Sequence, residues 1–124
     1  MAGSSKEFVL ELPQGIDAAH SVVLVLSDVQ LPRNTAVVLR ARLAESTPEV
    51  PLGSIGLLAE SKDAEGSARH AALRIDVTST LKRWRRDHPG VGTVRIRVAP
   101  YAGSEPLAGL EWSAASANLT LSER

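Results

Sequence analysis

Histidine is the side chain that most often binds metals or transfers protons near neutral pH, so the histidines of this chain are the first candidates for chemistry. They are His20, His70 and His88, and the chain contains no cysteine. They lie far apart in the sequence, two on expected strands and one at the end of an expected helix. None belongs to a ligand motif such as HExxH. The sequence therefore predicts no metal site, no bound cofactor and no catalytic histidine.

Two other polar patterns could also do chemistry. Ser54 stands between glycines, as a nucleophilic serine can, but its surroundings are aliphatic and no helix is expected after it. Asp76 and Thr78 form an Asp-x-Thr pattern that could hold a cation in front of an expected helix. Capping of the first helical turn explains both residues, so we predict that Thr78 is the helix N-cap. No residue is predicted to be catalytic.

Charge and hydropathy limit the classes of partner. The chain has 14 basic and 14 acidic residues, so no overall field draws it to nucleic acid. A basic cluster ends the expected helix: Lys82, Arg83, Arg85 and Arg86. It could dock on an acidic partner or on nucleic acid, but zero net charge favours a solvated helix end balanced by Glu60, Asp63 and Glu65. No apolar run is long enough to span a membrane, so neither nucleic acid nor membrane is predicted as a partner.

The stretch 69–100 is the centre of the expected fold. Leu73 and Ile75 alternate with charged residues, which is the pattern of a half-buried strand. Leu81 and Trp84 then follow at helical spacing, and His88-Pro89-Gly90 ends the helix, since the residue before a proline disfavours helical geometry. Alternation resumes after this, so a strand, one short helix and a second strand are expected.

Strand patterns cover much of the remaining chain, at 7–12, 20–26, 35–43, 52–59 and 110–121. The continuous apolar run 20–26 predicts a strand in the middle of a sheet with both faces covered. Glycines within 52–59 predict a bulge or a close backbone approach. The stretch 100–109 is expected to be a loop that carries Tyr101.

These elements predict a mainly β fold: an antiparallel β-sandwich, jelly-roll-like, with about seven strands and one short helix. Residues 6–122 are expected to form a single domain, after a flexible leader or cloning scar at 1–5. Aromatic residues make up only 3% of the chain, which disfavours stacking platforms for sugars or single-stranded nucleic acid. Without cysteine, the sequence does not decide the cellular compartment.

The order of the motifs resembles a known family. Ile75-Asp76-Val77-Thr78 followed by Leu81 is the sharpest motif, and Gly53-Ser54 with Leu57 supports it. Over residues 6–121 the chain resembles the C-terminal β-sandwich (KFDV-type) domain of polyphenol oxidases, the tyrosinases and catechol oxidases. The opening strand departs from that pattern, because Glu7 intervenes and Leu10-Glu11 stand where Asp-Val is expected.

The resemblance implies a role without catalysis. In that family a di-copper centre bound by six histidines lies in a separate helical domain. The sandwich of the same polypeptide packs over its entrance, keeps the enzyme latent, and commonly projects one side chain toward the coppers. The expected partner is therefore a catalytic di-copper domain. Tyr101 and Leu107, on the expected loop, are the candidate occluding residues, and Trp112 is either a core anchor or an exposed docking aromatic.

A second interpretation is a stand-alone binding or assembly module that recognises a carbohydrate, a peptide or another subunit. A row of exposed aromatic side chains or a calcium ion in a loop would favour it. Self-association into a homo-oligomer is left open by the sequence. A third interpretation, a small enzyme, is not favoured, because the sequence shows no set of residues that could form an active site.

Overall fold

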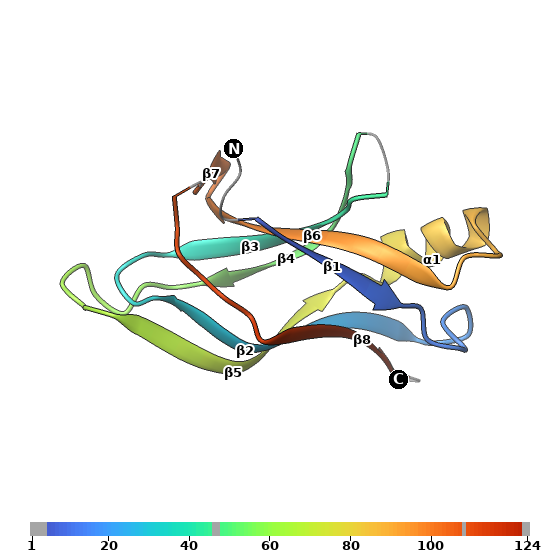
Figure 1. The fold of residues 1–124 in the computed structure, drawn as a ribbon, viewed down its shortest axis with the longest axis horizontal. Coiled ribbons are helices and arrows are strands. Elements are labelled where there is room, and N and C mark those ends of the chain that lie inside the picture. The colour runs from blue at the N-terminus through green and yellow to red at the C-terminus, as the bar shows by residue number, and fades with distance from the viewer. Residues whose placement is uncertain (1–4, 46–47, 108, 123–124) are drawn as a thin grey trace.

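The computed structural model describes residues 5–45, 48–107 and 109–122. The residues described form eight strands and one helix (Figure 1). In chain order they are β1 (Lys6–Glu11), β2 (Ser21–Pro32), β3 (Val37–Leu43), β4 (Val50–Leu57), β5 (Ser67–Asp76), α1 (Thr78–Asp87), β6 (Thr93–Ala102), β7 (Glu105–Pro106) and β8 (Ser116–Ser122). Of the predicted leader, residues 1–4 lie outside the described residues.

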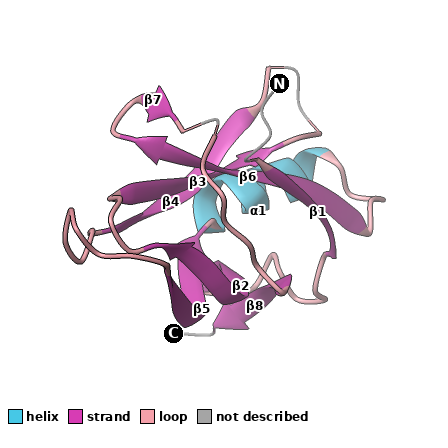
Figure 2. Ribbon diagram, turned by 60° about the vertical axis from the view of Figure 1, so that its left-hand side comes forward, coloured by secondary structure: helices cyan, strands magenta, loops and turns pink. Residues whose placement is uncertain are grey.

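The strands form two antiparallel sheets that face one another (Figure 2). The first sheet has the order β1-β6-β3-β4, with β7 paired to β6, and the second has the order β5-β2-β8. Each paired strand runs antiparallel to its neighbour. The predicted mainly β sandwich with one short helix is confirmed.

The core lies between the sheets and is almost entirely aliphatic. Buried residues alternate along β2, β3 and β6, so each strand turns one face to the core. The residues of β3 that were expected to face inward, Val37, Leu39, Ala41 and Leu43, are all buried. Helix α1 packs against β4 and β2 and adds Leu81 and Trp84 to the same core, as its spacing predicted.

One prediction about β2 is wrong. The strand does lie in the middle of a sheet, but only one of its faces is fully buried, because none of the described elements forms a layer over the outside of the second sheet. Val23 and Val25 on the outer face are half-buried. Their register partners include Arg74 on β5, and the stems of long side chains can shield apolar neighbours in this way. An apolar run of strand length therefore does not require a third layer.

The predicted close approach at a glycine of β4 is confirmed. The register of β3 and β4 shifts between Ala41 and Arg42, which marks a bulge in the ladder. At Gly53 a Cβ atom would lie 2.4 Å from the carbonyl oxygen of Asp76 and 2.9 Å from Cγ2 of Ile75. Gly53 is thus the point where the edge of the first sheet touches the end of β5.

The prediction that Thr78 caps the helix is corrected. The N-cap position is Val77, and no side chain makes a cap hydrogen bond there, because Thr78 is already the first helical residue. The Thr78 hydroxyl turns instead to β2, where it accepts a hydrogen bond of 2.9 Å from the Val22 N–H. The Asp76 carboxylate accepts the Thr78 N–H at 2.9 Å. Thr78 therefore ties the start of α1 to the second sheet.

We expect Thr78→Val to lower the free energy of unfolding by about 1–3 kcal/mol, because the part-buried Val22 N–H would lose its acceptor. Urea denaturation followed by circular dichroism measures this change. Thr78→Ser keeps the hydroxyl and should give a clearly smaller decrease. Equal losses in the two variants would contradict this prediction, because a retained hydroxyl would then give no protection.

The pKa of the Asp76 carboxyl lies below its ordinary value of 3.8, first because the Thr78 hydroxyl donates to it and second because the Thr78 N–H does. A lowered pKa in the folded state means that the stabilisation is present at higher pH and is lost as the pH falls below 3.8 through the folded value. Wild-type stability should therefore drop more than that of Asp76→Asn when urea denaturation is compared at about pH 5 and about pH 3. Asp87→Asn, at the exposed end of α1, is the control that should behave as wild type. Identical acid sensitivity of Asp76→Asn and wild type would contradict this.

Candidate interaction surfaces

The histidines do not come together. His20 is exposed in front of β2, His70 lies on β5, and His88 follows α1, where its ring stacks on Trp84 with centroids 4.6 Å apart. Within residues 5–45, 48–107 and 109–122, no group of three or more His, Cys, Asp or Glu side chains could hold a metal ion. Among the residues described, no helix has the length and apolar character that a membrane crossing requires.

None of the three predicted interface residues is fully exposed in the structure. Tyr101 lies within β6, half-buried, with the Arg40 guanidinium 4.6 Å from its ring centroid. Leu107 is half-buried against the core, and its N–H donates to the Pro100 carbonyl at 3.0 Å. Trp112 is only 7% exposed and belongs to the core. The interpretation of Trp112 as an exposed docking aromatic is wrong, because its side chain is buried in the core.

Among the described residues, the large apolar side chain with the greatest exposure was not predicted from the sequence. Leu58 is 94% exposed, directly after β4, in the segment that leads to β5. The turn beside it is fastened, since the Glu60 N–H donates to the Arg33 carbonyl at 2.8 Å. The signal in the sequence was the pair Leu57-Leu58, because neighbouring residues of an extended chain point to opposite sides. Leu58 therefore stands as an apolar projection on a fixed turn at one end of the sandwich.

The basic cluster on α1 is not balanced by the acids that were expected to do so. Glu60 faces Arg33 at 3.9 Å, at the other end of the sandwich. Lys82 donates to the Ala19 carbonyl oxygen, and Arg85 donates to the Pro89 carbonyl at 2.8 Å. Among the residues described, no ion pair involves the cluster. Arg85 and Arg86 lie in the last turn of α1, where positive charge is favourable.

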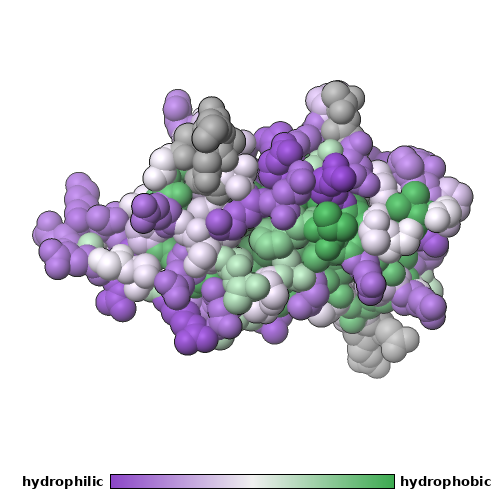
Figure 3. All heavy atoms as spheres, in the orientation of Figure 1, coloured by the Kyte–Doolittle hydropathy of each residue, from purple (hydrophilic) through white to green (hydrophobic). Residues whose placement is uncertain are grey.

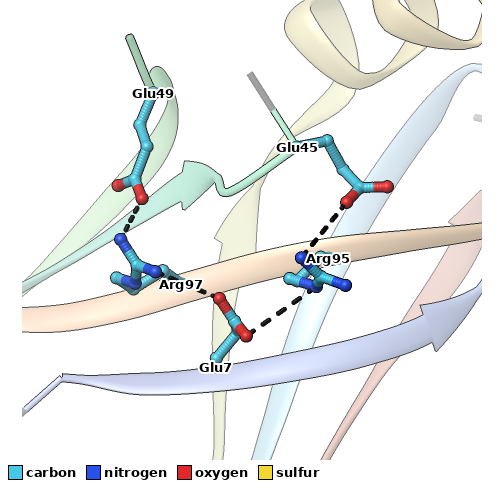
Figure 4. A network of polar contacts seen from close by, with 5 residues as sticks. All are labelled: Glu7, Glu45, Glu49, Arg95 and Arg97. Carbon is cyan, nitrogen blue, oxygen red and sulfur yellow. Dashed lines mark hydrogen bonds and ion pairs between the residues drawn. The ribbon is translucent and has the colours of Figure 1, made fainter. Parts of the chain in front are cut away.

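The outer face of the first sheet carries a network of ion pairs (Figure 4). Arg97 on β6 lies between Glu49 and Glu7, with 3.1 Å to the Glu7 carboxylate. Arg95, two residues earlier on β6, lies 3.7 Å from Glu7 and 3.9 Å from Glu45. Each exposed ion pair contributes little free energy alone. Because Arg95 and Arg97 share Glu7 on β1 and also contact Glu45 and Glu49, the network joins β1, β6 and the segment between β3 and β4.

An open groove runs between the edge strands β1 and β8. It has a volume of about 750 Å³, and its lining includes Val9, Leu12, Ala117 and Leu119. Val9 is 66% exposed. Figure 3 shows apolar side chains gathered over this part of the face, in the region where Figure 1 places β1 and β8. The groove offers an apolar surface beside two strand edges.

Comparison with known proteins gives a fold but no sequence family. No protein-family model matches the chain, and no curated protein matches it. Among solved structures, the chain superposes on latent apple tyrosinase with a TM-score of 0.63 at 14% sequence identity. The match covers 97% of this chain and 26% of the tyrosinase chain. This chain therefore shares the fold of one part of that structure, and it spans about a quarter of the length of the protein that it matches.

Proposed function

We propose that this chain is a non-catalytic shielding domain that keeps a tyrosinase-like di-copper oxidase latent. The observation that carries the proposal is the superposition of nearly the whole chain on about a quarter of a latent tyrosinase. The motifs Ile75-Asp76-Val77-Thr78 and Gly53-Ser54 independently resemble the C-terminal domain of that family. The partner of the shield is then the catalytic di-copper domain of the same polypeptide.

The proposed mechanism is steric and needs no chemistry in this chain. A sandwich with an aliphatic core presents a fixed surface to the entrance of the copper site and keeps phenols out. Leu58 is a better occluding residue than Tyr101 or Leu107, because its side chain is almost fully exposed and the turn beside it is held by a backbone hydrogen bond. A stable interface of this kind buries about 1,000 Å² or more.

The proposal is tested by adding the purified chain to a tyrosinase-like catalytic domain that has been freed of its own C-terminal part. We expect the two to co-elute in gel filtration and the rate of phenol oxidation to fall as the chain is added. Bovine serum albumin at the same concentration controls for non-specific effects. Full activity together with separate elution would contradict the proposal.

One observation favours the alternative, a stand-alone binding module. The groove between β1 and β8 could accept an extended peptide, which would add a strand to one of the free edges and place apolar side chains beside Val9 and Leu119. The carbohydrate version gains no support, because Trp84 and Trp112 are buried. Saturable shifts of the Val9 and Leu119 amide resonances with apolar peptides, in a chain that does not inhibit tyrosinase, would favour the alternative over shielding.

A further inference from the structure

We propose that a hollow on the outer face of the first sheet binds a carboxylate group carried on a hydrocarbon stem. The hollow, called here the arginine hollow, has a volume of about 250 Å³. It is lined by Val38, Arg40, Ala41, Arg42, Pro51, Gly53 and Ser54. The site is separate from Leu58 and from the groove between β1 and β8, and it does not depend on the proposed shielding function.

The bulge between β3 and β4 shapes the hollow. Arg40 pairs with Ser54 and Arg42 pairs with Pro51, so Leu52 is the extra residue, and its side chain is buried in the core. The residues of β4 that lie opposite the two arginines are therefore Ser54 and Pro51, and they form the β4 side of the hollow.

Arg42 supplies the strongest sign of a missing ligand. Its Nε atom is buried and has no hydrogen-bond partner among the residues described. A buried donor without an acceptor is costly, and more so when it carries charge. In the ladder Arg42 lies directly opposite Arg97, a like charge, so the protein itself supplies no compensation across that pair. An oxyanion beside the Arg42 guanidinium group would supply that compensation.

Arg40 is a second cation, already held in place. Its Nη2 donates to the Gly103 carbonyl at 2.6 Å, and its guanidinium group lies 4.6 Å from the Tyr101 ring centroid. An arginine has five N–H donors in a fixed plane, so most of them remain for a ligand after this bond. A fixed guanidinium loses little freedom when it binds an oxyanion.

The acids of this face do not neutralise the two arginines. Glu7, Glu45 and Glu49 all contact Arg95 or Arg97, as Figure 4 shows. In the part of the chain that the structure describes, neither Arg40 nor Arg42 takes part in an ion pair. The hollow therefore keeps an excess of positive charge beside a neutralised network.

The lining decides the class of anion. The planar fork of arginine matches a carboxylate through two parallel hydrogen bonds, and the Ser54 hydroxyl is a further donor in the lining. Val38 and Pro51 are apolar walls beside the charges, which suits the methylene stem of a carboxylate more than a fully hydrated phosphate. The carboxylate can come from a free aliphatic acid or from a glutamate side chain of a partner protein.

The test is an NMR titration of the ¹⁵N-labelled full chain, which follows the arginine Nε–Hε resonances at constant ionic strength. Sodium glutarate should shift the Arg42 and Arg40 resonances along a saturable curve, while that of exposed Arg74 on β5 stays in place. Sodium chloride should leave all of them unchanged. A peptide rich in glutamate forms a second arm: tighter saturation than with glutarate assigns the site to a protein side chain, and weaker saturation assigns it to a free acid.

The variants make the outcome decisive. Arg42→Gln should weaken glutarate binding by about tenfold or more, and Arg42→Lys should not restore it, because the ammonium lacks the planar fork. Arg74→Gln is the control and should bind as wild type. Linear shifts of equal size at all arginines, or saturation with phosphate but not with glutarate, would overturn the proposal. The wild-type titration decides the matter even where a variant does not fold.

Discussion

Replacement of Gly53 by alanine is expected to lower the free energy of unfolding by about 1–3 kcal/mol, and more if the backbone cannot shift. The new Cβ would lie 2.4 Å from the Asp76 carbonyl oxygen and 2.9 Å from Cγ2 of Ile75. The oxygen belongs to the backbone at the end of β5, so it cannot rotate away as a side chain would. The next residue is also held, because the Val77 N–H donates to the Val22 carbonyl at 3.0 Å. Urea denaturation of the purified variant measures the loss.

Gly56→Ala is the matched control for this prediction. It lies on the same strand, but the nearest atom to its new Cβ would be Cγ2 of Val38, at 4.0 Å, which is an ordinary contact. Its stability should stay within about 0.5 kcal/mol of wild type. Similar losses at both glycines would mean that strand propensity, and not the close approach of β4 to β5, explains the glycine at position 53.

The second large effect is expected from Leu58→Asp in the inhibition assay. Burial of a leucine side chain in an interface contributes roughly 1.5–3 kcal/mol, so its loss should weaken inhibition by about tenfold to a hundredfold. A carboxylate in an apolar pocket adds a desolvation cost in the same direction. The measurement is the inhibition constant for phenol oxidation by the freed catalytic domain.

A loss of inhibition by Leu58→Asp would not be caused by unfolding, because Leu58 is 94% exposed. Its replacement should leave the free energy of unfolding within about 0.5 kcal/mol of wild type. Val9→Asp is the control, since Val9 is also an exposed aliphatic residue but lies on β1, away from the turn that carries Leu58. It should inhibit as wild type does. Loss of inhibition by Val9→Asp alone would move the docking surface to the groove between β1 and β8.

Much of the fold could be predicted because it follows from local patterns. Alternation along β3 and β6 sets which residues face the core, and the helical spacing of Leu81 and Trp84 sets how α1 packs. The glycines of β4 predicted a close approach, and Gly53 makes one. In these cases the physical cause lies within a few residues of the pattern.

The errors concern contacts between distant segments. Thr78 has the chemistry of a helix cap, but its hydroxyl bonds to Val22 on β2, a partner that only the packing of α1 on the second sheet provides. Tyr101 follows a proline and reads as loop, yet its pairing with Val38 on β3 extends β6 through it. Trp112 lies outside the strands, and its side chain is nevertheless buried in the core.

The candidate surfaces were the least predictable part. The arginine hollow needs Arg42 from β3, Ser54 from β4 and Gly103 after β6, and a bulge determines how they meet. No spacing in the sequence encodes that arrangement. Leu58 was in principle visible, because two adjacent leucines in a strand cannot both face the core.

The dependence of the oxidation rate on phenol concentration, at several fixed concentrations of this chain, tests the proposed shielding most directly. A domain that covers the entrance competes with substrate, so the apparent KM should rise in proportion to the concentration of the chain while kcat stays constant. A fall in kcat at unchanged KM, or no change in either, would contradict occlusion of the entrance.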